Sequence, residues 1–496
     1  MSTIRSLDPA DRNQIDDTAI NSYWNFKPKA AINTSTTKYM HIYHDAQDNI
    51  NGTTFNEKTS IKFLIRDDNN FLLPQDAYLE VRVAVTRTDV AHVVALNNPM
   101  GHVLFSAVKY SIGANEIEDI SNYYPYKALA KGLTRYTRSS LGTTHLFEGW
   151  ALDGPLKPED WAVDTTLNST TATNAGFKKR LDYATGHTAY RVYRGTQALP
   201  GVPTDATGGN LTRATSLNLT YNFKIPLREM FAFCTDVDSV FMGDTHTIEL
   251  IKNNSVSQMV TNADGLAYTL ANFTIENIKL YMPYVKPSGP VYSLMLDNFI
   301  KPAATKLLFY PSKVYLNQVT PAAAPSYTLN WDITNLSLDP ISLCFFMTHA
   351  SDLTTGISKT TFIHNFLTKI KVTIGAEDFP QRDIECDFPN KAAITAYERY
   401  KEMCVYSRGD VALSYEDFLF AYPMFCFDFK DVSDTIFAGN KSVRITAEFS
   451  SPLIAASQFT GNRANIQPFN AYAVIDYRQV GTYITAPNSI QFYKNG

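Results

Sequence analysis

The histidines are the first residues of this chain whose type and spacing could bind a metal. His41 and His44 form the tightest pair in the sequence. Residues three apart on a β-strand face opposite sides, so these two imidazoles cannot readily bind one ion. The sequence contains no His-Glu-x-x-His, phosphate-loop, calcium-loop or Gly-x-Ser-x-Gly motif. We therefore expect no metal-binding, cofactor-binding or catalytic residues.

Cysteine chemistry is a second possibility. Cys386 and Cys404 flank a predicted helix and could in principle pair with His364 to form a nucleophile. Spacing alone does not establish such a pair, and buried structural thiols are far commoner. The chain has five cysteines, an odd number, and no Cys-x-x-Cys motif. This usage is typical of assembly in a reducing compartment, so we predict that all five are free thiols.

Carboxylates close to tryptophans raise a third possibility, the binding or cleavage of sugars. The segment 148–161 carries Glu148, Trp150, Asp153, Glu159, Asp160 and Trp161. Nothing in the sequence sets the carboxylate separation that a glycosidase requires. The tryptophans could stack on a sugar ring, or they could anchor a long loop on a β-sandwich. A carbohydrate-binding or receptor-binding β-sandwich stays open as the alternative function, and we predict that the protein is not an enzyme.

Alternating strands are the elements that must position any such site. In 78–87 and in 443–449, apolar side chains alternate with polar or charged ones, which indicates strands with one buried face. Aromatic residues reach 13%, mostly tyrosine and phenylalanine, which favour strands. Helical periodicity is rare, and the two best helix candidates are 125–138 and 389–403. The pattern predicts an all-β protein with two short helices.

An internal repeat organises these elements. Residues 108–114 match 370–376, and the two helix candidates that follow share Pro, Lys, Ala, Arg and Tyr at a constant offset of 264 residues, from Pro125 to Pro389. Residues 238–243 then match 434–439 in the same order. Half-buried strands can resemble one another by chance, but that would not reproduce a helix in register. Tandem duplication of one β domain is the better interpretation.

Proline and glycine cluster at 286–290, which marks the predicted boundary between the copies. The division gives an N-terminal arm at 1–34, a first β domain at 35–287 and a second at 288–496. The first domain carries a polar insertion at 139–216, where the second needs only about 20 residues. Surface loops accept such growth at little entropic cost. We expect the insertion to form the outward crown of the first domain and to contact neighbouring subunits.

Apolar residues are expected to hold the first part of this insertion down by burial: Leu146, Phe147, Trp150 and Trp161. The glycine-rich stretch 201–209 is expected to be exposed. On this interpretation, Trp150→Ala should weaken the contacts between subunits.

Charge and hydropathy limit the partners. The net charge is −4, which argues against broad adhesion to nucleic acid. The longest apolar runs, such as 341–347, are far too short to cross a bilayer. The N-terminus lacks the basic and apolar regions of a signal peptide. We expect no specific nucleic-acid binding, no transmembrane segment and no exported precursor.

The tandem domains, each with a strand–glycine–helix element and a later proline–aromatic segment, resemble a known family. The stretches that carry the likeness are 123–127, 221–227, 238–243 and 246–250. The chain resembles the double jelly-roll major capsid proteins of DNA viruses, and within them those of Polinton-like and adintovirus-like elements. The likeness runs from about residue 35 to the end of the chain, and it consists of patterns of strand, turn and helix.

That resemblance implies an all-β fold of two tandem eight-stranded antiparallel jelly rolls, with one short helix per copy. It also implies a structural major capsid protein that assembles as pseudo-hexameric homotrimers into an icosahedral shell. Its partners would be further copies of itself in the trimer and in neighbouring capsomers, together with penton and minor capsid proteins. Its location would be the virion, after assembly inside the host cell.

Overall fold

The computed structural model describes the chain over the residues 36–47, 60–87, 94–153, 176, 179–180, 183–184, 218–262, 271–289, 292–293, 304–321, 325–334, 336, 338–350, 360–375, 377–404, 410–429, 442–450, 466, 468–484 and 489–493. The expected N-terminal arm lies outside these residues, as do 154–175 and 185–216 of the expected insertion.

Two antiparallel four-stranded sheets form the first half. Their strand orders are β1-β11-β4-β8 and β2-β9-β6-β7, and the short strand β3 (Phe71–Leu72) also pairs with β11. A separate ribbon pairs β5 (Val94–Leu96) with β10 (Val260–Asn262). The main strands are β1 (Thr36–Asp45), β2 (Ser60–Ile65), β4 (Tyr78–Arg87), β6 (Phe105–Ile112), β7 (Asn115–Ile120), β8 (Asn218–Pro226), β9 (His246–Lys252) and β11 (Ala271–Pro287).

The second half repeats this arrangement. One sheet has the order β12-β20-β15-β18, with β13 also paired to β20, and the other has the order β14-β19-β16-β17. Its strands are β12 (Ala304–Phe309), β13 (Ser312–Val319), β14 (Ser326–Ile333), β15 (Asp339–His349), β16 (Leu367–Ile374), β17 (Glu377–Glu385), β18 (Met424–Asp428), β19 (Val443–Ser450) and β20 (Phe469–Ile484), with β21 (Ser489–Tyr493) added to β20.

Counted along the chain, each half pairs its first, eighth, third and sixth strands in one sheet and its second, seventh, fourth and fifth in the other. The two strands β12 and β13 together occupy the first position of the second half. Two such sheets packed face to face make a jelly roll. The structure confirms the predicted all-β fold of two tandem eight-stranded antiparallel jelly rolls.

The predicted alternation is visible in the burial of individual strands. In β4, Leu79, Val81 and Val83 are buried, whereas Glu80 and Arg82 between them are exposed. Successive side chains of a strand point to opposite faces, so each sheet buries one face against its partner.

The two expected helices are α2 (Tyr124–Arg135) and α9 (Ile394–Met403). α9 begins at Ile394 rather than at Pro389, because the preceding residues form a turn in which Lys391 has a positive φ of 58°. The structure also contains short helices that the sequence pattern did not reveal: α3 (Arg138–Leu141), α5 (Leu227–Met230), α6 (Ala232–Asp236), α7 (Val256–Met259), α10 (Tyr415–Phe420), η1 (Pro74–Asp76) and η2 (Thr144–Glu148). None of the helices in the described ranges is long and apolar enough to cross a bilayer.

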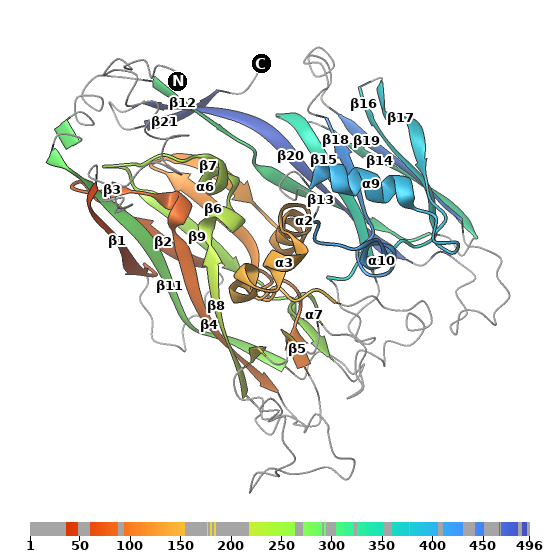
Figure 1. Ribbon diagram of the computed structural model, residues 1–496, viewed down its shortest axis with the longest axis horizontal. Coiled ribbons are helices and arrows are strands. Elements are labelled where there is room, and N and C mark those ends of the chain that lie inside the picture. The colour runs from red at the N-terminus through yellow and green to blue at the C-terminus, as the bar shows by residue number, and fades with distance from the viewer. Residues whose placement is uncertain are drawn as a thin grey trace, which may run out of the picture.

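Each half has its own hydrophobic core, but the halves exchange elements. Residues of α2 pack into the core of the second half, with Trp150 beside them. In return Leu307, Phe309 and Tyr483 of the second half pack into the first core. Figure 1 shows α2 between the two lobes and the long strand β20 reaching from the second lobe toward the first. The two jelly rolls are therefore joined by shared packing.

Candidate functional site at the junction of the two jelly rolls

Helix α2 is the central element of the junction. It follows Tyr123, whose φ of 59° turns the chain sharply, and Pro125 occupies the first turn, where a missing N–H costs nothing. Tyr124 and Ala128 face the first core, whereas Leu129 and Leu133 face the second. A helix normally buries one stripe. This helix buries two, because it is wedged between the sandwiches.

Trp150 locks α2 in place. Its side chain is 1% exposed and meets the ring of Tyr136 edge-on, with the centroids 5.3 Å apart. A Cβ atom at Gly132 would lie only 2.2 Å from two carbons of the indole ring, so the helix needs glycine there for the close approach. Gly149, at φ +87°, makes the turn that delivers Trp150 into this position.

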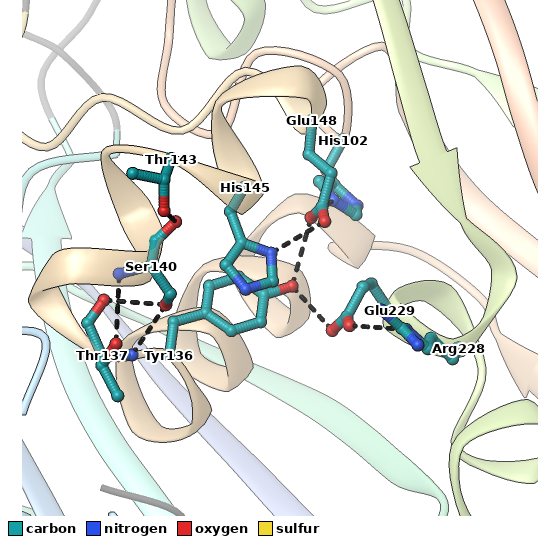
Figure 2. A network of polar contacts seen from close by, with 9 residues as sticks. All are labelled: His102, Tyr136, Thr137, Ser140, Thr143, His145, Glu148, Arg228 and Glu229. Carbon is teal, nitrogen blue, oxygen red and sulfur yellow. Dashed lines mark hydrogen bonds and ion pairs between the residues drawn. The ribbon is translucent and has the colours of Figure 1, made fainter. Parts of the chain in front are cut away.

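Tyr136, which contacts Trp150, belongs to a network of polar side chains. Figure 2 shows this network. A carboxylate oxygen of Glu148 lies 2.9 Å from His145 Nδ1, and the other lies 3.4 Å from His102 Nε2. The Tyr136 hydroxyl donates toward Glu148 at 3.1 Å and toward Glu229 at 2.6 Å. The imidazole of His145 stacks on the ring of Tyr136, with centroids 3.4 Å apart. The network ties η2, α2 and α5 together.

Glu148 stays ionised inside this network. Burial alone would raise the pKa of Glu148, but hydrogen bonds and charge from His102 and His145 outweigh burial and lower it to about 2. Burial and the two nearby carboxylates raise the pKa of Tyr136 well above its ordinary value. The carboxylate is therefore ionised and the phenol neutral at neutral pH. Glu148 and His102 are 3% and 1% exposed, so the arrangement can hold elements together but cannot reach a substrate.

An ion pair crosses directly from one jelly roll to the other. Lys131 of α2 contacts Asp476 of β20. Asp476 also accepts hydrogen bonds of 2.7 Å from the hydroxyls of Ser312 and Ser342. Burial would raise the pKa of Asp476, but the Lys131 charge and these hydrogen bonds lower it. Nearby, the rings of Tyr126 and Tyr472 stack at 4.1 Å across the same boundary.

The first part of the expected insertion packs on the second jelly roll. Asp153 N–H donates to the Tyr422 hydroxyl at 3.1 Å, and the carboxylate of Asp153 forms a buried 2.7 Å ion pair with Arg180. The Ser139 hydroxyl donates to the carboxylate of Asp410 at 2.9 Å. Within 139–153, Leu141, Glu148, Trp150 and Asp153 are buried at the junction, whereas Ser139, 142–144 and Phe147 are exposed. The expected outward crown is therefore wrong for the buried residues, and contacts of the segment with neighbouring subunits stay a prediction.

The residues expected to anchor the insertion differ in how deeply they are buried. Trp150 is buried within its own chain, as predicted, and the effect of Trp150→Ala on contacts between subunits stays a prediction. Leu146 is half-buried, and Phe147 is 61% exposed, which contradicts its role as an anchor. Trp161 and 201–209 lie outside the described residues.

The histidine pair of β1 behaves as its spacing indicates. His41 Nε2 lies 3.4 Å from the carbonyl oxygen of Asp76, whereas His44 Nε2 lies 3.1 Å from the Tyr284 hydroxyl. The two rings therefore face different partners. Over the ranges that the structure describes, no group of three or more His, Cys, Asp or Glu side chains is placed to hold a metal ion.

The cysteines are buried and unbridged. Cys344 and Cys426 face each other across β15 and β18, with their sulfurs 3.9 Å apart, too far for a bond. Burial raises the pKa of Cys386 to about 12. The ring of His364 stacks on Phe388 at 4.4 Å, and its Nδ1 accepts the Phe366 N–H. These contacts give no support to a cysteine–histidine nucleophile.

The three sugar-site candidates in the described ranges do not form an open surface. Glu148 and Asp153 are buried in the contacts above, and so is Trp150. Glu159, Asp160 and Trp161 lie outside the described residues. Sequence reasoning missed His102 and Glu229, which lie 46 and 81 positions from Glu148, at separations that no local pattern reveals. The repeat could have pointed to α2, since it aligns Tyr136 with Tyr400, whose hydroxyl donates to the Leu133 carbonyl at 2.7 Å.

Comparisons with known proteins agree on the fold. The family model of the double jelly roll-like domain matches residues 204–458. A solved chain of the Sputnik virophage is similar over 100% of this chain and 93% of its own, with 11% identity and a TM-score of 0.56. The mavirus major capsid protein is similar over 100% and 96%, with 11% identity and a TM-score of 0.52. The VP54 protein of PBCV-1 is similar over 92% and 97%, with 9% identity and a TM-score of 0.53. No curated protein matches the sequence.

Proposed function

Since the chain belongs to the double jelly roll-like domain family, we propose that it is the major structural protein of a viral capsid. Three copies assemble as a trimer with a pseudo-hexameric outline, and the trimers tile an icosahedral shell. The protein acts by assembly and has no catalytic role.

The observation that carries this proposal is the fusion of two jelly rolls of identical strand order into one block. The shared packing around α2, the Lys131–Asp476 pair and Trp150 holds the two wedges in one relative orientation. A chain with two similar wedges can supply six to a trimer, and a closed ring needs such repeated surfaces. The fold likeness to the mavirus major capsid protein covers nearly the whole of both chains and supports the same role.

The remaining parts of the proposal follow from the capsid role. The first jelly roll occupies 35–287 and the second 288–496, after an N-terminal arm at 1–34. Further copies in neighbouring capsomers, penton proteins and minor capsid proteins are its partners, and nucleic acid is not bound specifically. The protein resides in the virion after assembly inside the host cell. The alternative, a carbohydrate-binding or receptor-binding β-sandwich, loses its described candidates, because Glu148, Trp150 and Asp153 are buried.

Light scattering of the purified full chain tests the proposal. At micromolar concentration the protein should have three times the mass of one chain, and electron micrographs should show particles with a six-sided outline. A stable monomer at that concentration would contradict the assembly role. Saturable glycan binding by such a monomer would support the alternative.

A further inference from the structure

An exposed aromatic cluster covers the outer side of the sheet β1-β11-β4. We call it the tyrosine face and define it by Tyr39, His41, Tyr43, Tyr78 and Tyr281. Tyr39 and Tyr43 are 48% and 54% exposed. The rings of Tyr78 and Tyr281 stack at 4.8 Å, and Tyr43 lies 6.2 Å from Tyr281. Clustered tyrosines are enriched where one protein surface meets another.

The rings of this face are poorly arranged for a sugar. A stacking platform needs an open ring face, but Tyr78 is covered by Tyr281 and by Lys224, whose Nζ lies 3.8 Å from the ring centroid. Lys279 Nζ likewise lies 4.3 Å from the centroid of Tyr43. These stacked and capped rings suit a protein partner better than a carbohydrate.

The corresponding face of the second jelly roll is already covered within the chain. The sheet β13-β20-β15 presents Tyr472, Phe346 and Asp476 on its outer side. Tyr126 of α2 stacks on Tyr472, and Lys131 of α2 pairs with Asp476. The first jelly roll thus places the helix that follows its fifth strand on the outer sheet of the second. The equivalent face of the first jelly roll, the tyrosine face, has no such cover among the described residues.

The edge strands also include one pair that meets inside the chain and an equivalent pair that does not. β7 is an outer strand of the first jelly roll and β13 is an outer strand of the second. The two line a common groove of about 540 Å³ between the halves. Their counterparts in the repeat are β17 and β1, which are also edge strands. Figure 1 places β1 and β17 at opposite ends of the molecule. β17 and β1 are therefore the counterparts, at opposite ends of the molecule, of the two strands that line a common groove inside the chain.

We propose that β17 and the helix α9 after it, from a second copy of this chain, cover β1 and the tyrosine face, as β7 and α2 cover β13 and its sheet within the chain. The inference rests on the proposed capsid function and assigns the surface through which the trimer closes. Such a head-to-tail contact joins two different surfaces, and it forms a ring if successive rotations add up to a full turn.

Charge and apolar exposure fit the two surfaces together. β17 exposes the carboxylates of Glu377 and Asp383, whereas that of Glu385 also lies 3.9 Å from Lys369 on the neighbouring strand β16. On the tyrosine face, Lys279 of β11 and Lys224 of β8 hold their ammonium groups over the rings of Tyr43 and Tyr78. α9 adds Ile394, which is 61% exposed. The offset of 264 matches Ile394 to Ala130, which is 1% exposed against the second core. Ile394 is thus an apolar residue whose internal counterpart is covered.

A charge placed in the tyrosine face tests this assignment. Tyr43→Glu should leave the chain folded, because the residue is exposed and Lys279 is there to pair with the new carboxylate. It should weaken trimer formation at least ~30-fold, since a charge would be buried at the contact. The matched control is Leu64→Glu on the other sheet, where Leu64 is 45% exposed and the proposal places no neighbour. Circular dichroism checks folding, and light scattering follows assembly.

Crosslinking of the wild-type protein gives a readout independent of folding defects. Carbodiimide treatment of mixed ¹⁴N- and ¹⁵N-labelled trimers should join Lys279 or Lys224 to carboxylates of β17 in mixed-isotope peptides. Trimers that form equally well in both glutamate variants, with no such crosslinks, would overturn the interface and leave the capsid role intact. Monomeric wild-type protein would instead contradict the proposed function. Glycan binding that Tyr43→Glu abolishes without affecting the trimer would also overturn the inference.

Discussion

The effect of Gly132→Ala on stability should change sign when Trp150, which contacts Gly132, is removed. A Cβ at position 132 would lie 2.2 Å from two indole carbons, whereas ordinary contacts of this kind are 3.4–4 Å. The ring would have to move by more than 1 Å inside a packed junction. Overpacking of this kind costs ~1–3 kcal/mol, offset by the ~1 kcal/mol that alanine gains over glycine in a helix. Gly132→Ala should therefore destabilise the chain by up to ~2 kcal/mol.

Removing the tryptophan reverses that result. Trp150→Ala alone should cost ~3–5 kcal/mol through the cavity it leaves. With the ring gone, the added methyl at Gly132 meets no indole, and only the helix propensity remains. In the Trp150→Ala background, Gly132→Ala should therefore stabilise the chain by ~1 kcal/mol.

Calorimetry of the four proteins at one fixed concentration measures the cycle, because the melting temperature of an assembling protein depends on concentration. At ~2–4 °C per kcal/mol for a domain of this size, Gly132→Ala should lower the midpoint by up to ~8 °C in the wild type and raise it by ~2–4 °C in the variant. Gly142→Ala is the control, since its nearest neighbouring atom would lie 3.8 Å from the new Cβ. The same sign in both backgrounds would refute the packing of Trp150 on α2.

Three further outcomes are expected. Asp476→Asn should cost ~3–5 kcal/mol of stability in calorimetry, because it leaves the Lys131 ammonium largely buried without its partner. Glu402→Gln, in an exposed ion pair of α9, should cost under ~0.5 kcal/mol. Equal effects of the two variants would argue against the interdomain ion pair. Burial lowers the pKa of His246 to about 4, so its neutral form is favoured in the folded state. The free energy of unfolding should therefore fall by up to ~3 kcal/mol as the pH drops from 6.5 to 4. His246→Asn should flatten that part of the pH profile, and an unchanged profile would count against the burial of His246. A thiol reagent should label none of the five cysteines in the native protein and all five after unfolding, whereas three labelled thiols would reveal a bridge.

Sequence alone determined the elements and their repetition. The alternation in β4 and β19 identified strands with one buried face, and burial follows it throughout β19 and in β4 up to Ala84, which is also buried. The repeat revealed that two similar domains follow one another, and the strand orders agree. These properties are visible in a sequence because the period of a strand is set by its own backbone, and a duplicated unit keeps its own local pattern.

Only the tertiary structure decided how the two domains meet. A helix normally buries one apolar stripe, but α2 packs on two cores, and Tyr136 reaches Glu229 across 93 positions. Phe147 and Trp150 are three residues apart and both are large aromatic residues, yet one is 61% and the other 1% exposed. Their difference depends on where Gly132 leaves room on a helix packed between distant strands. Such fits arise from the docking of whole elements, and no local periodicity records them.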